Sequence, residues 1–258
     1  MSGTRRIGWP LADLCRAPNG PRDRQLLMGE AVDLTDAPAS SSGLTRGSPA
    51  GWIAVTAQRD GYPGFVPEAA LAPDAPVTHR VSARATHLYP AADFKTPERA
   101  MLSLGAQVQV TGEAGRFAQT PQGFVPRAHL APLDAPESDP VTVAARLIGT
   151  PYLWGGNSSL GIDCSGLVQI ACLACALPCP GDSAEQEAAL GHPLPEDAPL
   201  ARGDLLFWRG HVAWVADPDT LLHANAHHMA VAYEPLHDAI ARIAAQGDGP
   251  VTARKRLG

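Results

Sequence analysis

A ten-residue segment that occurs twice is the feature that most limits how this chain can fold. Residues 64–73 read Gly-Phe-Val-Pro-Glu-Ala-Ala-Leu-Ala-Pro, and residues 123–132 repeat eight of these ten positions at an offset of 59. Upstream, residues 28–34 correspond in the same order to residues 104–110. Two copies are too few for a solenoid or a propeller. The repeat therefore predicts two small domains of the same fold in tandem.

Each copy is built from short, alternating apolar segments separated by Gly and Pro, which is the pattern of β-strands joined by tight turns. The Gly-Phe-Val-Pro ending, followed by a short turn and Leu, resembles bacterial SH3-like domains. We expect one small SH3-like β-barrel over residues 1–76 and a second over residues 77–136. The Asp- and Pro-rich stretch 133–140 is expected to be a linker.

The pattern changes after Pro140. Helices are expected near 141–148, 163–177 and 237–246, and strands near 204–208, 211–216, 221–226 and 231–235. A buried helix followed by antiparallel strands is an α+β arrangement. Residues 137–258 are thus expected to form the third domain. The basic residues 253–256 are expected to be a solvated, frayed end of the chain.

Cys164 lies at the expected start of the helix over 163–177, where unpaired backbone N–H groups favour an anion such as a thiolate. A thiol nucleophile needs a base. His211 and His223 lie in two expected strands joined by the turn Asp217-Pro218-Asp219-Thr220. Pairing about that turn would place position 211 roughly opposite 223 or 224. His211 is then the expected base, and His223 the residue that orients its ring.

These residues belong to a longer series of motifs. Pro151-Tyr152-Leu153-Trp154-Gly155-Gly156, Asp163-Cys164-Ser165-Gly166-Leu167, Gly203-Asp204-Leu205-Leu206-Phe207, Gly210-His211-Val212-Ala213 and His223-Ala224 follow one another in the chain. In this order they resemble the NlpC family of cell-wall peptidases. The resemblance implies a papain-like catalytic domain with Cys164, His211 and His223 as its triad and Tyr152 beside the oxyanion. It also implies cleavage of the bond between γ-D-Glu and a diamino acid in peptidoglycan stem peptides.

The tandem SH3-like domains extend the resemblance to recycling enzymes that act on stem peptides with a free N-terminal L-Ala. By that resemblance Asp182 and Ser183 would line the substrate pocket, and Glu30 and Tyr62 of the first barrel would bind the L-Ala amine. The repeat supports this assignment, because Glu30 and Tyr62 align with Ala106 and Pro121 in the second copy. Both polar residues are peculiar to the copy expected to contact the ligand, and an ammonium would gain charge-assisted hydrogen bonds from carboxylates.

The composition excludes several classes of partner. The formal net charge is −6, whereas nucleic acids and anionic membranes require a basic face. We expect neither as a partner and no cofactor. Residues 1–30 show no apolar segment typical of a secretory signal, and five cysteines, four within 164–179, do not suggest a disulfide framework. These features favour the cytoplasm.

Two metal interpretations have simpler alternatives. Cys172, Cys175 and Cys179 resemble part of an iron–sulfur run, but on one face of a helix they would more simply fill the core. His223, His227 and His228 are close in sequence, yet 223 and 227 would be about 13 Å apart along a strand. No metal is therefore expected. An acyltransferase or amidase on the same thiol, and a non-catalytic wall-peptide binding module, stay open as other functions.

Overall fold

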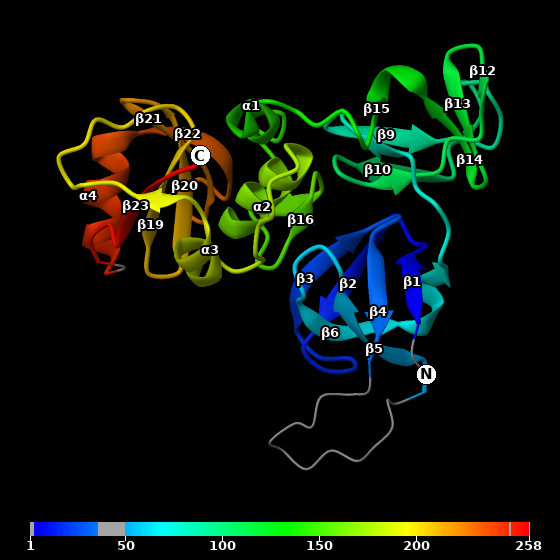
Figure 1. The fold of residues 1–258 in the computed structure, drawn as a ribbon, viewed down its shortest axis with the longest axis horizontal. Coiled ribbons are helices and arrows are strands. Elements are labelled where there is room, and N and C mark those ends of the chain that lie inside the picture. The colour runs from blue at the N-terminus through cyan, green and yellow to red at the C-terminus, as the bar shows by residue number, and fades with distance from the viewer. Residues whose placement is uncertain (1–2, 36–49, 248, 258) are drawn as a thin grey trace. The chain divides into compact units, whose positions relative to one another are not determined.

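The structure is a computed structural model that describes residues 3–35, 50–247 and 249–257. The chain divides into two compact units, Met1–Ala135 and Pro136–Gly258, which are described separately below. Figure 1 shows the strands of the first unit and the mixed helices and strands of the second. None of the helices in the described ranges is long and apolar enough to cross a membrane.

The first barrel is an antiparallel sheet in the order β3-β2-β6-β5-β4-β1-β7. Its strands within the described residues are β1 (Thr4–Ile7), β2 (Leu11–Cys15), β3 (Arg22–Leu27), β4 (Ala31–Leu34), β5 (Trp52–Ala57), β6 (Pro63–Pro67) and β7 (Leu71–Pro73). The core consists of alternate residues of these strands, including Leu14, Leu26, Val32, Val55 and Val66. Alternation places every second side chain on the inner face, which is what a small barrel requires.

The second barrel is made of three small antiparallel sheets, β10-β9, β11-β8-β15 and β12-β13-β14. Its described strands are β8 (His79–Val81), β9 (Ala85–Leu88), β10 (Ala100–Ser103), β11 (Gln107–Val108), β12 (Gly112–Ala114), β13 (Phe117–Thr120), β14 (Gly123–Pro126) and β15 (Leu130–Pro132). The repeat seen in the sequence is also structural. In each copy Gly-Phe-Val-Pro forms a strand, followed by a 3₁₀ turn (Glu68–Ala70 or Arg127–His129) and a final short strand.

A second correspondence lies at the turn before β4 and β11. Gly29 and Gly105 have φ of +83° and +89°, in the left-handed region that glycine adopts without strain. The N–H of Gly29 donates to the carbonyl of Ile7 (2.8 Å), and the N–H of Gly105 donates to the carbonyl of Val81 (2.9 Å). The weaker upstream repeat therefore encodes the same turn in both barrels.

The second unit is a sheet with helices on both faces. Its described helices are α1 (Pro140–Ala145), α2 (Cys164–Ala174), α3 (Ser183–Ala189) and α4 (Leu236–Gln246). The described strands are β16 (Asn157–Ser158), β17 (Gly161–Ile162), β18 (His192–Pro193), β19 (Asp204–Trp208), β20 (His211–Asp217), β21 (Thr220–Asn225), β22 (Ala230–Pro235) and β23 (Ala253–Arg256). The main sheet runs β18-β23-β19-β20-β21-β22; α4 packs on one face and α2 on the other (Figure 1).

Two expectations about this unit are wrong. Residues 253–256 are not a frayed end but the strand β23, which pairs with β18 and β19. Arg256 explains the difference, because its guanidinium donates two hydrogen bonds of 2.8 Å to the buried carboxylate of Asp204. Helix α2 ends at Ala174 rather than near Leu177, and Ala176 lies in the left-handed region with φ of +57°. The expected boundaries at 76/77 and 136/137 stay predictions.

Candidate active site

Cys164 is the first residue of α2, and the residue before it builds the surrounding loop. Asp163 is the N-cap: its Oδ1 accepts hydrogen bonds from the N–H of Gly166 (2.7 Å) and the hydroxyl of Ser165 (3.1 Å). Its Oδ2 accepts from the N–H of Gly155 (2.9 Å). One buried carboxylate thus ties the glycine-rich loop to the helix start. The thiol consequently sits where the helix presents unpaired N–H groups.

Glycine is required where this loop meets the helix. A Cβ on Gly166 would lie 2.5 Å from the carbonyl oxygen of Gly156, closer than a side chain can approach. Tyr152 lies half-buried in the same loop. Burial raises the pKa of its phenol, and the nearby Cys164 and Asp163 raise it further. The Tyr152 hydroxyl therefore keeps its proton and can donate a hydrogen bond beside the thiol.

His211 and His223 meet on one face of the sheet. Nε2 of His211 lies 2.9 Å from Nδ1 of His223, and Sγ of Cys164 lies 4.0 Å from the carbonyl oxygen of Gly210, the residue before His211. The strand register differs slightly from the sequence expectation. Trp214 pairs with Leu222, so His223 is a diagonal rather than a direct neighbour of His211, with an irregularity at residue 216. Val215 and Leu221 pair across the two strands and point to the same face. His211 is four residues from Val215 and His223 is two residues from Leu221, so both histidines share that face.

Two charged residues that the sequence interpretation missed extend this pair. Nε2 of His223 lies 2.9 Å from Oε2 of Glu234 in β22, and Glu234 pairs in register with Leu221, two residues from His223. Arg242 of α4 donates to both carboxylate oxygens of Glu234, at 2.8 Å and 2.7 Å. The signal available in the sequence was the charged Glu234 in the otherwise mostly apolar strand Ala230–Pro235. A buried charge is rarely unpaired, so a partner such as Arg242 was to be expected.

Burial determines the charge of the two histidines. It lowers the pKa of His211 to about 3, and the neighbouring His223 and Arg242 act in the same direction. Burial also lowers the pKa of His223, and the opposing hydrogen bond to Glu234 does not cancel this effect. For Glu234, burial acts to raise the pKa, but hydrogen bonds from Arg242 and His223 outweigh it and hold the pKa well below its ordinary value. At pH 7 both imidazoles are neutral and Glu234 is ionised.

The residues expected to bind the substrate amine lie in both units. In the first barrel Glu30 is 9% exposed; its carboxylate accepts hydrogen bonds from the Leu27 N–H (3.0 Å) and from Arg59 (2.6 Å). Tyr62 packs against the barrel core, with the guanidinium of Arg24 5.4 Å from its ring centre. Glu30 and Tyr62 thus already make contacts within the first barrel, and an ammonium would have to share the Glu30 carboxylate with Arg59.

Asp182 and Ser183 lie at the start of α3 in the second unit. Asp182 is the N-cap residue, is exposed, and makes no side-chain capping hydrogen bond. Ser183 is the first helical residue and is half-buried. The helix is oriented by Gln186, whose side-chain amide donates to the carbonyls of Ser165 and Pro180, both at 2.9 Å. Gln186 therefore connects α3 directly to the first turn of α2.

A possible metal donor set differs from the one considered in the sequence. Donor atoms of His223, His228 and Glu234 lie within 4.8 Å of one another, so Glu234 takes the place given to His227. Both ring nitrogens of His223 are engaged in hydrogen bonds, and Arg242 brings a positive charge to Glu234. Of the three cysteines considered for a cluster, Cys172 and Cys179 are buried and Cys175 is half-buried. Only Cys172 of these three lies within α2, so they do not share one helix face.

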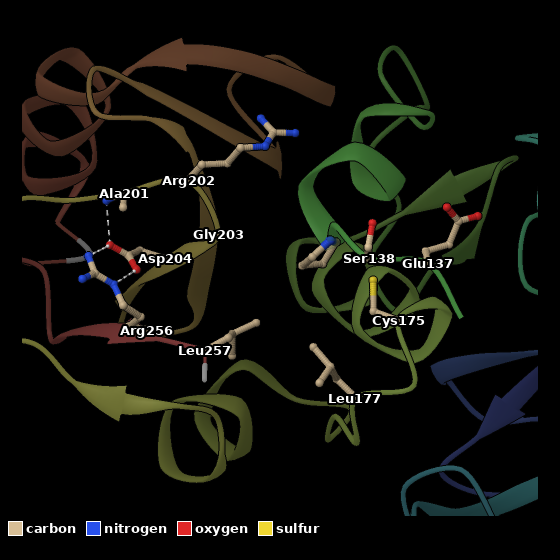
Figure 2. Close-up of a pocket in the computed structure, with 11 residues that line it drawn as sticks. Glu137, Ser138, Cys175, Leu177, Ala201, Arg202, Gly203, Asp204, Arg256 and Leu257 are labelled. Carbon is tan, nitrogen blue, oxygen red and sulfur yellow. Dashed lines mark hydrogen bonds and ion pairs between the residues drawn. The ribbon is translucent and has the colours of Figure 1, made fainter. Parts of the chain in front are cut away.

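A cavity of 510 Å³ lies elsewhere in the second unit (Figure 2). Glu137, Cys175 and Leu177 line one side, and Arg202 and Arg256 are on the other. Its charged groups are paired, since Arg256 binds Asp204 and Arg202 binds Asp139. The cavity includes the C-terminal end of α2, whereas Cys164 is at the N-terminal end. It is therefore separate from the candidate active site.

Comparison with known proteins agrees with this geometry. Residues 149–244 match the model of the NlpC/P60 family, and residues 14–71 match that of the bacterial dipeptidyl-peptidase Sh3 domain. Residues 149–244 thus form a domain similar to the NlpC/P60 family. The matched span contains the thiol, both histidines, Glu234 and Arg242. The Sh3 match begins and ends within the first barrel.

Two curated relatives match parts of this chain. It is 41% identical over 87 residues to dipeptidyl-peptidase 6 of Lysinibacillus sphaericus, which is 33% of this chain and 31% of that protein. It is 30% identical over 159 residues to γ-D-glutamyl-L-lysine dipeptidyl-peptidase of Bacillus subtilis, which is 57% of this chain and 52% of that protein. The chain thus matches between about a third and a half of the length of these relatives.

A solved structure shows the same fold along nearly the whole chain. An NlpC/P60 family protein from Bacillus cereus superposes with a TM-score of 0.79, covering 99% of each chain at 18% sequence identity. At this identity the likeness concerns the fold alone. It supports the expected class: an α+β papain-like domain preceded by SH3-like strands.

Proposed function

We propose that this protein is a cysteine peptidase that hydrolyses the bond between γ-D-Glu and a diamino acid in peptidoglycan stem peptides. The substrate would carry a free N-terminal L-Ala, and the product would be L-Ala-γ-D-Glu. The observation that carries the proposal is the position of Cys164 at the start of α2, with its sulfur 4.0 Å from the carbonyl oxygen of Gly210. The next residue, His211, is hydrogen-bonded to His223, and both histidines are neutral. The names of the two curated relatives, both dipeptidyl-peptidases, support the substrate class.

The proposed mechanism gives each of these groups one role. Neutral His211 takes the proton of the Cys164 thiol, and the thiolate attacks the γ-carbonyl of D-Glu. The oxyanion is stabilised by the backbone N–H of Cys164 and by the protonated hydroxyl of Tyr152. His211 then protonates the leaving amine of the diamino acid. Water hydrolyses the thioester, which releases the dipeptide and restores the thiol.

The preference for a free amine is the finer part of the proposal. Glu30 and Asp182 would supply negative charge to the ammonium of L-Ala, and Tyr62 would supply a polar hydroxyl. A wall at this position would exclude longer peptides, so the enzyme would release dipeptides. Such substrates are fragments already separated from the glycan, and we therefore propose a role in the recycling of stem peptides in the cytoplasm.

Mass spectrometry of the products tests the reaction. The purified protein is incubated with L-Ala-γ-D-Glu-diaminopimelate and with the corresponding L-Lys peptide, alongside Cys164→Ala. We expect the wild type to release L-Ala-γ-D-Glu and the variant to release none above background. Cleavage by both proteins would reject Cys164 as the nucleophile, and no cleavage of either peptide by the reduced wild type would reject the substrate.

The amine preference has a separate test. N-acetylation of the L-Ala residue removes the positive charge and leaves the scissile bond unchanged. We expect hydrolysis of the acetylated peptide to be at least about 100-fold slower, since the site would lose charge-assisted hydrogen bonds worth roughly 3 kcal/mol. Equal rates on the two peptides would contradict the roles of Glu30, Tyr62 and Asp182 without affecting the triad.

A further inference from the structure

The hydrogen bonds around His223 form a chain with a defined direction. Arg242 donates to Glu234, Glu234 lies 2.9 Å from Nε2 of His223, and Nδ1 of His223 lies 2.9 Å from Nε2 of His211. His223 is 1% exposed and Glu234 is 6% exposed, so water does not compete for these contacts. The charged or titratable groups around His223 are His211 from β20, Glu234 from β22, Arg242 from α4 and His228 from the loop after β21.

An ionised carboxylate can only accept hydrogen bonds. The proton of neutral His223 must therefore be on Nε2, where it faces Glu234, and its Nδ1 is left as an acceptor. His211 must then place its own proton on Nε2 to donate to His223. This leaves Nδ1 of His211 as the basic nitrogen, available for the proton of Cys164. The orientation of a single carboxylate thus determines which nitrogen of the base is free.

We propose that Glu234, held by Arg242, is a positioning residue that sets the tautomer of His223 and, through it, the tautomer of His211. The inference rests on the proposed function for its kinetic consequence, but the tautomers themselves do not depend on any substrate. Glu234 contacts neither Cys164 nor the reacting atoms in this scheme. Its contribution is to fix the direction of the hydrogen bonds that reach the base.

Glu234→Gln is the decisive variant, because it preserves the shape and removes the charge. Arg242 can donate only to the Gln carbonyl oxygen, which turns the amide NH₂ toward His223. The amide then donates to Nε2, the His223 proton moves to Nδ1, and His211 loses its free Nδ1. We expect kcat to fall about 100-fold and KM to change less than about twofold. The expected loss of kcat lies between that caused by replacing a residue that only supports a functional side chain and that caused by reversing the tautomer of a catalytic histidine.

Two further variants separate positioning from packing. Glu234→Asp is shorter but still accept-only, so we expect its kcat to exceed that of Glu234→Gln; a packing role would favour the isosteric Gln. Glu137→Gln is the matched control. Arg146 donates two hydrogen bonds, each of 2.8 Å, to the carboxylate of Glu137, and Arg242 likewise donates two to Glu234. The backbone N–H of Glu137 donates to the carbonyl of Ala174, which lies at the opposite end of α2 from Cys164. The Glu137→Gln variant should be as active as the wild type.

The readout that needs no substrate is ¹⁵N–¹H correlation of histidine-labelled protein near pH 7, which distinguishes protonated from unprotonated ring nitrogens. We expect the Nε2–H tautomer at His223 and His211 in the wild type and the Nδ1–H tautomer in Glu234→Gln. Unchanged tautomers in that variant, or a kcat within twofold of the wild type, would overturn the proposal. If the wild type cleaves no stem peptide but shows these tautomers, only the proposed function fails.

Discussion

Asp163 organises the candidate active site through its hydrogen bonds alone. It accepts hydrogen bonds from Gly155, Ser165 and Gly166, on both sides of the thiol in sequence. The glycine-rich loop and the first turn of α2 consequently share a single buried acceptor. The position of the Cys164 sulfur relative to the loop therefore depends on Asp163 as much as on the helix itself.

Replacing Asp163 by Ala should affect both stability and catalysis. Three donors would lose their acceptor in a buried site, and we expect the free energy of unfolding to fall by about 3 kcal/mol. Because the loop and thiol would no longer be held in register, kcat should fall by about 10- to 100-fold. Urea unfolding and steady-state hydrolysis of the tripeptide measure the two effects.

Asp139→Ala is the control for this prediction. Asp139 is also a helix N-cap, accepting from the N–H groups of Val141 and Thr142 at the start of α1. Its loss should cost about 1–2 kcal/mol of stability and leave kcat unchanged. An equal loss of kcat in both variants would show that any weakened helix end impairs the enzyme, and would remove the special role of Asp163.

The residues proposed to carry the chemistry could be named from the sequence, whereas the residues that contact them in the structure could not. Cys164, His211 and His223 stand in local motifs whose residue types and order are specific. Glu234 and Arg242 carry no such motif, and their role arises from the register of β21 with β22 and from the packing of α4. A register cannot be obtained from the alternation of one strand alone, since a shift of two residues leaves that alternation unchanged.

At the scale of elements, the turn before β4 connects the two barrels of the first unit. The N–H of Gln107 donates to the carbonyl of Met28 (2.7 Å), and a Cβ on Gly29 would lie 2.2 Å from the carbonyl oxygen of Gln107. Gly29 therefore satisfies two separate requirements. It allows a positive φ, and it leaves room for the backbone of β11.

Gly29→Ala should separate these requirements when it is compared with Gly51→Ala. Gly51 has a similar φ of +88°, but a Cβ added there would meet no atom within 4 Å. We expect Gly51→Ala to cost about 1 kcal/mol from the backbone alone and Gly29→Ala to cost at least about 3 kcal/mol, since backbone strain and overpacking both apply. Thermal unfolding of the first unit measures the stability of both variants. Equal losses of stability would contradict the close approach of Gly29 to the backbone of β11.

Helices α1, α2 and α4 and the central strands β19–β22 lie near their expected positions because hydrophobic periodicity determines them, whereas α3 was not expected. The exceptions have another origin. Residues 253–256 contain Arg254, Lys255 and Arg256, so their composition favours a solvated segment. Their strand conformation depends on Asp204, a buried carboxylate 52 residues earlier that Arg256 neutralises. Long-range pairing of charges leaves no local periodic signal, and the expectation failed for that reason.

At the scale of the whole molecule, the buried histidines make the second unit sensitive to acid. In the unfolded chain a histidine has an ordinary pKa of about 6.5, but in the folded protein His211 takes a proton only near pH 3, and His223 is shifted in the same direction. The unfolded state therefore binds more protons below pH 6.5. The stabilisation is complete above that pH and is lost progressively as the pH falls toward 3.

We expect the unfolding free energy of the second unit to decrease between pH 6.5 and pH 4.5 by up to about 1.4 kcal/mol per pH unit for each histidine. Fluorescence of the buried Trp208 and Trp214 during urea unfolding reports on this unit when Trp9 and Trp52 of the first unit are replaced by Phe. His211→Gln should reduce the pH dependence by the share of one histidine. The same slope in that variant would show that other groups cause the acid sensitivity.

The strand order of the main sheet in the second unit also has a consequence for biosynthesis. β23 is the last strand of the sheet in sequence, yet it lies between β18 and β19, and β19 pairs with the strand that begins at His211. While a ribosome is still adding residues 253–256, the nascent chain has every group of the proposed triad but lacks an interior strand of the sheet beneath it. Formation of a competent peptidase would thus coincide with the end of synthesis of this domain rather than with the appearance of its nucleophile.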